Sequence, residues 1–86
     1  MKYDKKALKV EVLKVFEGVC NLDNYEMVAL TEHFEDLRQI SEENSGEMAD
    51  TARVMLCGAL NFLAAAQHIT DEQCESLTNL TYMVTG

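Results

Sequence analysis

Apolar residues recur every three or four positions along most of the chain, which is the spacing of one face of an α-helix. The densest apolar segment is Thr51–Ile69. Its thirteen residues from Val54 to Ala66 include a single polar side chain, Asn61. The pattern predicts a long apolar helix here, with the other segments arranged to cover it.

A first helix is predicted to begin after Asp4, whose carboxylate can cap it, and to end near Val19. Its inward-facing residues are Leu8, Val12, Val15, Phe16 and Val19. Apolar and charged residues alternate over positions 8–12, so a strand remains an alternative for this segment.

A second helix is predicted to follow Asp23, because Glu26 three residues later completes a capping-box pattern. It would end near Ile40, with an inward stripe of Met27, Leu30, Phe34 and Leu37. Positions 41–46 are strongly polar and predict a loop, although a helix continuing through Ser41 is also compatible with the pattern.

The third helix is predicted to begin at Gly46 or Glu47 and to end near Gln67. A fourth should follow Thr70, which forms a capping box with Gln73. Its inward-facing residues would be Cys74, Leu77, Leu80, Thr81 and Val84.

Residues 1–86 therefore predict one all-α domain, a compact four-helix bundle with the apolar third helix at its centre. A helix that is apolar on nearly all sides should be buried on nearly all sides. A chain this short buries only about 60% of its unfolded surface, so its core is thin and a homodimer would add burial.

The third helix has two unequal faces. The bulky face, expected in the core, consists of Met55, Leu56, Ala59, Phe62, Leu63 and Ala66. The narrow face, a candidate dimer contact, consists of Val54, Gly58, Asn61 and Ala65. A mid-helix glycine costs about 1 kcal/mol relative to alanine, which close approach of another helix would justify. That helix could belong to the same chain or to a second copy. Asn61 could pair with its symmetry mate, or bond locally and lie partly exposed.

Charge is unevenly distributed along the chain, whose net charge is −8. Five lysines lie within Lys2–Lys14, whereas the later residues carry thirteen acids against Arg38 and Arg53. Such a body repels nucleic acid, so direct binding is not expected except through the basic end. No apolar run is long enough for a membrane span, and no secretory signal is evident. An odd number of cysteines then favours reduced thiols in the cytoplasm.

The acidic surface is the candidate partner-binding site. The residues chosen for it are Glu32, Glu35, Asp36, Glu42 and Glu43. Such a surface can simply keep a small protein soluble. It can also imitate nucleic-acid phosphates and bind a partner protein with a basic surface.

No catalytic, metal or cofactor site is predicted. The candidate ligands are Cys20, Cys57, Cys74, His33 and His68. Their spacing lacks the close pairs of a structural zinc site, and no thiol or hydroxyl is placed beside a base. The chain is not expected to be an enzyme.

The segments 19–23 and 30–35 together resemble the first two helices of the DNase-colicin immunity proteins, which are acidic four-helix inhibitors. That family's short third helix, with paired tyrosines before a proline, is absent, and this chain contains no proline. The resemblance therefore assigns no site. We expect the chain to be a regulatory protein that acts by protein–protein interaction, as a homodimer in the cytoplasm. The alternative is an acidic inhibitor of a nucleic-acid-binding enzyme, of phage or immunity type.

Overall fold

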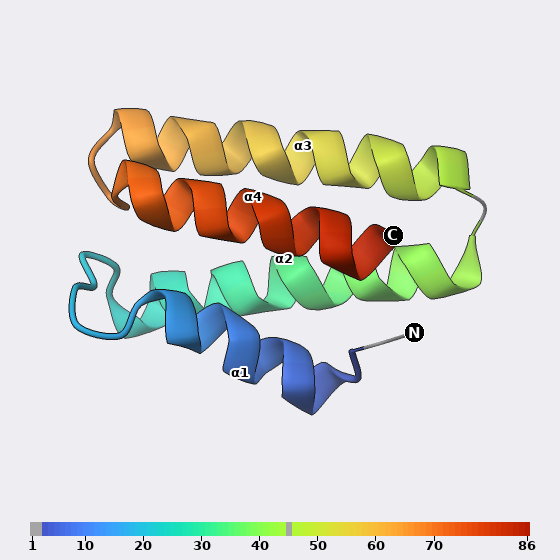
Figure 1. Ribbon diagram of the computed structural model, residues 1–86, viewed down its shortest axis with the longest axis horizontal. Coiled ribbons are helices and arrows are strands. Elements are labelled where there is room, and N and C mark those ends of the chain that lie inside the picture. Colours follow the sequence, from blue (N-terminus) through green and yellow to red (C-terminus); the bar gives the residue numbers. More distant parts are fainter. Residues whose placement is uncertain (1–2, 45) are drawn as a thin grey trace.

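The computed structural model describes residues 3–44 and 46–86, and these fold into four α-helices without a strand. The helices are α1 (Lys5–Val15), α2 (Asn24–Glu43), α3 (Gly46–Ala65) and α4 (Asp71–Thr85). The predicted all-α four-helix bundle is confirmed, and its first segment is a helix rather than a strand (Figure 1). Lys2 of the predicted basic segment and Ser45 of the predicted loop lie outside the described residues.

Three helices begin where the sequence predicts, because a side chain at each start accepts hydrogen bonds from backbone amides of the first turn. The Asp4 carboxylate caps α1 in this way. Asp23 and Glu26 form a complete capping box at the start of α2. Thr70 and Gln73 form the same arrangement at the start of α4.

Two helix ends come earlier than predicted. Helix α1 stops at Val15, and Gly18, with φ +94°, turns the chain toward α2. Helix α3 ends in a Schellman motif, in which the His68 amide donates to the Leu63 carbonyl at 2.9 Å. Gln67 occupies the left-handed position of this motif with φ 64°, a position more often held by glycine.

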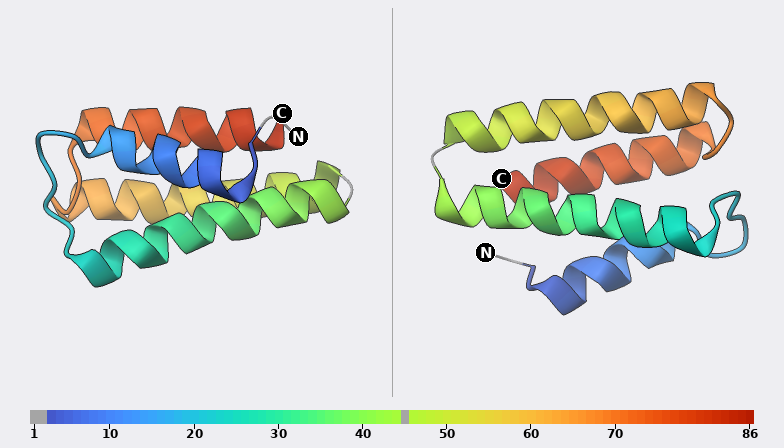
Figure 2. Two further views of the ribbon diagram at one scale, coloured as in Figure 1. Left: turned by 90° about the horizontal axis from the view of Figure 1, so that it is seen from below. Right: turned by 180° about the vertical axis from the view of Figure 1, so that it is seen from behind.

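The middle of the bundle is formed by α2 and α4 rather than by α3. Helix α1 packs on α2 and α4 from one side, and α3 packs on the same two helices from the other (Figure 2). Within the described residues, α1 and α3 make no close backbone contact. The expectation that the third helix is covered on nearly all sides is therefore wrong, because only two neighbours reach it.

A single core joins the four helices. Its buried members are Leu8, Val12, Phe16, Leu22, Leu30, Phe34, Leu37, Leu56, Leu60, Ile69, Cys74, Leu77, Leu80 and Val84. Most predicted inward stripes contribute to it, but Val19 is exposed because α1 ends before this residue. No helix of the described chain is both long and apolar enough to cross a bilayer.

Candidate protein-binding groove

The strip that the sequence predicts as a dimer contact faces solvent. Its four residues, Val54, Gly58, Asn61 and Ala65, are all exposed. A Cβ atom built on Gly58 would meet no neighbour within 4 Å in the described part of the chain. The interpretation that another helix of the same chain packs closely on this glycine is therefore wrong. Asn61 is exposed, and its Oδ1 accepts a hydrogen bond from the Cys74 thiol of α4 at 3.4 Å. Its pairing with a symmetry mate stays a prediction.

The bulky face that the sequence places in the core also lies largely on the surface. Met55 is 72% exposed and Phe62 is 70% exposed, while Ala59 and Ala66 are exposed as well. Leu56 is buried and Leu63 is half-buried. The cause is the direction of packing: α2 and α4 contact the side of α3 that carries Ala49, Leu56 and Leu60.

Two residues of α3 are buried although the sequence pattern did not predict it, Ala49 and Leu60, and the Leu60 side chain is 0% exposed. Its spacing from Leu56 and Leu63 is helical, so a stripe through these three leucines was a possible signal. Residues on the opposite side of α3, such as Met55 and Phe62, are equally apolar, so the pattern does not distinguish the two sides.

A groove runs between α2 and α3 on this exposed side. It contains two hollows, of about 350 and 340 Å³, that share His33, Leu56 and Ala59. The first hollow extends toward Tyr25 and Phe62. The second extends toward Ile40, Met55 and Ala52. The floor consists of core leucines, among them Leu30, Leu37 and Leu56. The groove is thus an apolar surface that the chain itself leaves uncovered.

The charged residues that line this groove are acids, and two lysines of α1 share a neighbouring cleft with Glu32 and Asp36. Glu26 and Asp36 line it, and Glu32 and Glu43 lie near Asp36 on the exposed side of α2 at helical spacing. Among the described residues that line the two hollows, none is lysine or arginine. The groove therefore combines an apolar floor with an acidic border along α2.

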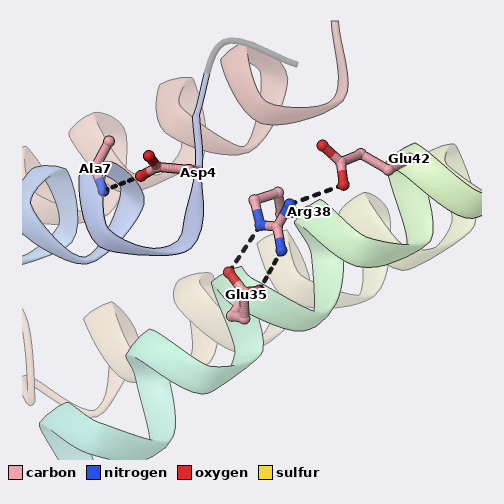
Figure 3. A network of polar contacts seen from close by, with 5 residues as sticks. All are labelled: Asp4, Ala7, Glu35, Arg38 and Glu42. Carbon is pink, nitrogen blue, oxygen red and sulfur yellow. Dashed lines mark hydrogen bonds and ion pairs between the residues drawn. The ribbon is translucent and has the colours of Figure 1, made fainter.

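Both arginines are engaged away from the groove. Arg53 donates to the Asp50 carboxylate at 3.2 Å, and its guanidinium lies over the Tyr82 ring with Cζ 4.3 Å from the ring centroid. Arg38 lies between two carboxylates of its own helix, Glu35 and Glu42 (Figure 3).

Two of the five predicted partner-binding acids, Glu35 and Glu42, are paired with Arg38. Arg38 holds Glu35 through two hydrogen bonds and Glu42 through one at 2.8 Å. The hydrogen bonds from Arg38 are the main reason that the pKa of Glu35 lies below its usual value, and burial opposes them. The remaining three acids, Glu32, Asp36 and Glu43, are exposed. Of these three, Asp36 lines the groove, whereas Glu32 lines the cleft between α1 and α2.

The lysine-rich segment lies on the other side of α2. Lys5 and Lys9 of α1 line a cleft of about 320 Å³ together with Glu32, Glu35 and Asp36. Lys5 also contributes to the lowered pKa of Glu35 through its charge. The basic end of the chain therefore lies beside acids of the same molecule rather than standing apart from the body.

The cysteines differ in their surroundings. Cys74 is buried and Cys57 is half-buried, but Cys20 is exposed. The Cys57 sulfur lies 3.4 Å from the Thr81 hydroxyl oxygen. Among the described residues, no group of three or more His, Cys, Asp or Glu side chains could hold a metal ion.

Comparison with known proteins finds no matching family model, no matching curated relative and no matching solved structure.

Proposed function

We propose that this protein is a non-enzymatic, regulatory interaction protein that binds another polypeptide through the apolar groove between α2 and α3. The observation that carries the proposal is the exposure of Met55 and Phe62, large apolar side chains at the edge of two apolar hollows. Contiguous apolar surface of this kind on a small domain is typical of protein-binding sites. Leaving it uncovered also withholds burial from a chain whose core is already thin.

The alternative class, an acidic inhibitor that imitates phosphates, has less support. It requires a continuous negative surface, yet Arg38 neutralises Glu35 and Glu42, two of the five acids expected to form it. Asp36 and Glu26 instead line an apolar groove. Salt separates the two classes, because exposed charges are screened within about 8 Å at physiological ionic strength and apolar contacts are not. Partner capture that disappears at high salt would favour the phosphate mimic.

Capture of the partner from the cell of origin tests the proposal. We compare the wild-type protein with a Met55→Ser, Phe62→Ser variant and with a matched control, Val10→Ser, Leu13→Ser. The control also replaces two exposed apolar residues, but on α1. We expect the α3 variant to lose the partner and the α1 variant to retain it. Equal capture by the α3 variant and the wild type would contradict the proposal.

Self-association through Val54, Gly58, Asn61 and Ala65 stays a prediction. A second copy would compete for the same side of α3, because the strip adjoins Phe62 and Met55 on the helix surface. A stable dimer of standard size buries about 800 Å² on each partner. Sedimentation across micromolar concentrations measures whether this chain forms one.

A further inference from the structure

We infer that the occupant of the α2–α3 groove is an amphipathic helix of the partner protein with lysine or arginine along one flank. This inference rests on the proposed function and adds the chemistry of the partner to it.

The shape of the groove suits a helix. Its walls are two neighbouring helices, and the hollows follow α2 from Tyr25 to Ile40. Those positions span about 23 Å at the helical rise of about 1.5 Å per residue, which matches roughly four turns of a bound helix. Helix-in-groove recognition places apolar residues at i, i+3, i+4 and i+7 into such a surface.

Two large hydrophobic side chains offer contacts to that stripe. Phe62 borders the hollow near Tyr25, and Met55 borders the hollow near Ile40. Ala59 lies between them on α3 and lines both hollows, so α3 presents a small side chain at the middle of the groove and leaves room for a helix there. The flexible thioether of Met55 can adjust to the side chain it meets.

The carboxylates beside the groove favour basic residues along one side of the bound helix. The α2 side of the groove carries Glu26 and Asp36 in its lining, and Glu43 lies at an exposed position seven residues after Asp36 on the same helix. The described lining residues offer no cation to balance a carboxylate of the partner. A helix with acids along this flank would meet like charges, whereas lysine or arginine would form ion pairs and speed association.

Three synthetic peptides of about 18 residues test the inference, since four to five helical turns match the groove. The first combines a leucine stripe at i, i+3, i+4 and i+7 with lysines on the remaining positions. The second has the same composition in scrambled order, so its charge is equal and its stripe is lost. The third keeps the stripe and replaces lysine by glutamate. Fluorescence anisotropy measures binding to the full chain at low and physiological salt, and amide chemical shifts locate it.

We expect the striped lysine peptide to bind at least tenfold more tightly than either control. The largest shifts should lie at Ala29, His33, Ala59 and Phe62. Phe62→Ser should weaken binding tenfold or more. Asp36→Asn should weaken it severalfold and reduce its salt dependence. The control Val10→Ser should leave it unchanged.

Four outcomes would overturn the inference. They are absence of binding by the striped lysine peptide, equal binding of the scrambled peptide, equal binding of the glutamate peptide, and shifts confined to α1. If a second copy of the chain occupies the groove instead, the protein will dimerise as its concentration rises, and the peptide will bind more weakly at high protein concentration. If no peptide binds but Phe62→Ser still abolishes capture of the native partner, the basic helix is wrong and the proposed function stands.

Discussion

The Gln73 side chain donates a hydrogen bond from Nε2 to the Val19 carbonyl oxygen at 2.6 Å, joining α4 to the loop that follows α1. Gln73 is buried, and its Oε1 also accepts a hydrogen bond from the Thr70 amide in the capping box. One side chain therefore starts α4 and fixes the path of the chain between α1 and α2.

Replacing Gln73 by alanine should lower the free energy of unfolding by about 1–3 kcal/mol, because it removes two hydrogen bonds and leaves the Val19 carbonyl unpaired. Urea unfolding followed by circular dichroism measures the change. Asn79→Ala, at an exposed position of the same helix, is the control and should change stability little. Equal stability of the two variants would show that the hydrogen bond to Val19 contributes nothing.

The pair Glu35–Arg38 should make stability depend on pH. Hydrogen bonds from Arg38 lower the pKa of Glu35 in the folded chain below its ordinary value of 4.5. The folded state therefore binds this proton less readily than the unfolded state, and the stabilisation is fully present above about pH 4.5. It is lost as pH falls through the lowered pKa.

Glu35→Gln should accordingly be less stable than the wild type at pH 7, and the difference should shrink as the pH falls below 4.5. Urea unfolding at several pH values measures it. Glu43→Gln, an exposed position of the same helix, should show a smaller difference at pH 7. If the free energies of unfolding of Glu35→Gln and the wild type differ by the same amount at every pH, the Glu35–Arg38 pair is not the source of the pH dependence.

Gly58 should tolerate a side chain. A Cβ atom there meets nothing within 4 Å among the described residues, so Gly58→Ala should raise stability by up to about 1 kcal/mol through helix propensity. Gly18→Ala is the opposite case, because φ +94° disfavours any side chain, and it should destabilise by about 1–2 kcal/mol.

Unfolding at several protein concentrations extends the Gly58 test to self-association. If a second copy packs closely on Gly58, the unfolding midpoint will rise with concentration and Gly58→Ala will destabilise. If no second copy packs there, Gly58→Ala will stabilise the chain to the same extent at every protein concentration.

The starts of three helices could be predicted from the sequence because capping is local. Asp4, Asp23 and Thr70 each act within three residues, and their partners are visible in the chain. The ends were less predictable. The Schellman motif after α3 uses Gln67 in a left-handed conformation, and nothing in a glutamine side chain signals this.

The orientation of α3 could not be predicted, for a reason that lies in its composition. Periodicity identifies a buried face only when the opposite face is polar. Here Phe62 and Leu60 are both large and apolar, yet one is 70% and the other 0% exposed. Which side is buried depends on where α2 and α4 pack, and that is a property of the whole bundle. The groove depends on this arrangement, so the sequence predicted Leu30, Leu37, Leu56 and Asp36 as separate features but not that they line one groove.

The unfolding free energies of Leu60→Ala and Phe62→Ser test the central claim, that the bulky residues of α3 face solvent and remain available for a partner. We predict that Leu60→Ala costs about 2–5 kcal/mol, as expected for a buried leucine. Phe62→Ser should change stability by about 0.5 kcal/mol or less, because serine and phenylalanine have similar helix propensities and the site is exposed. If Phe62→Ser lowers the free energy of unfolding as much as Leu60→Ala does, the claim is contradicted and Phe62 belongs to the core.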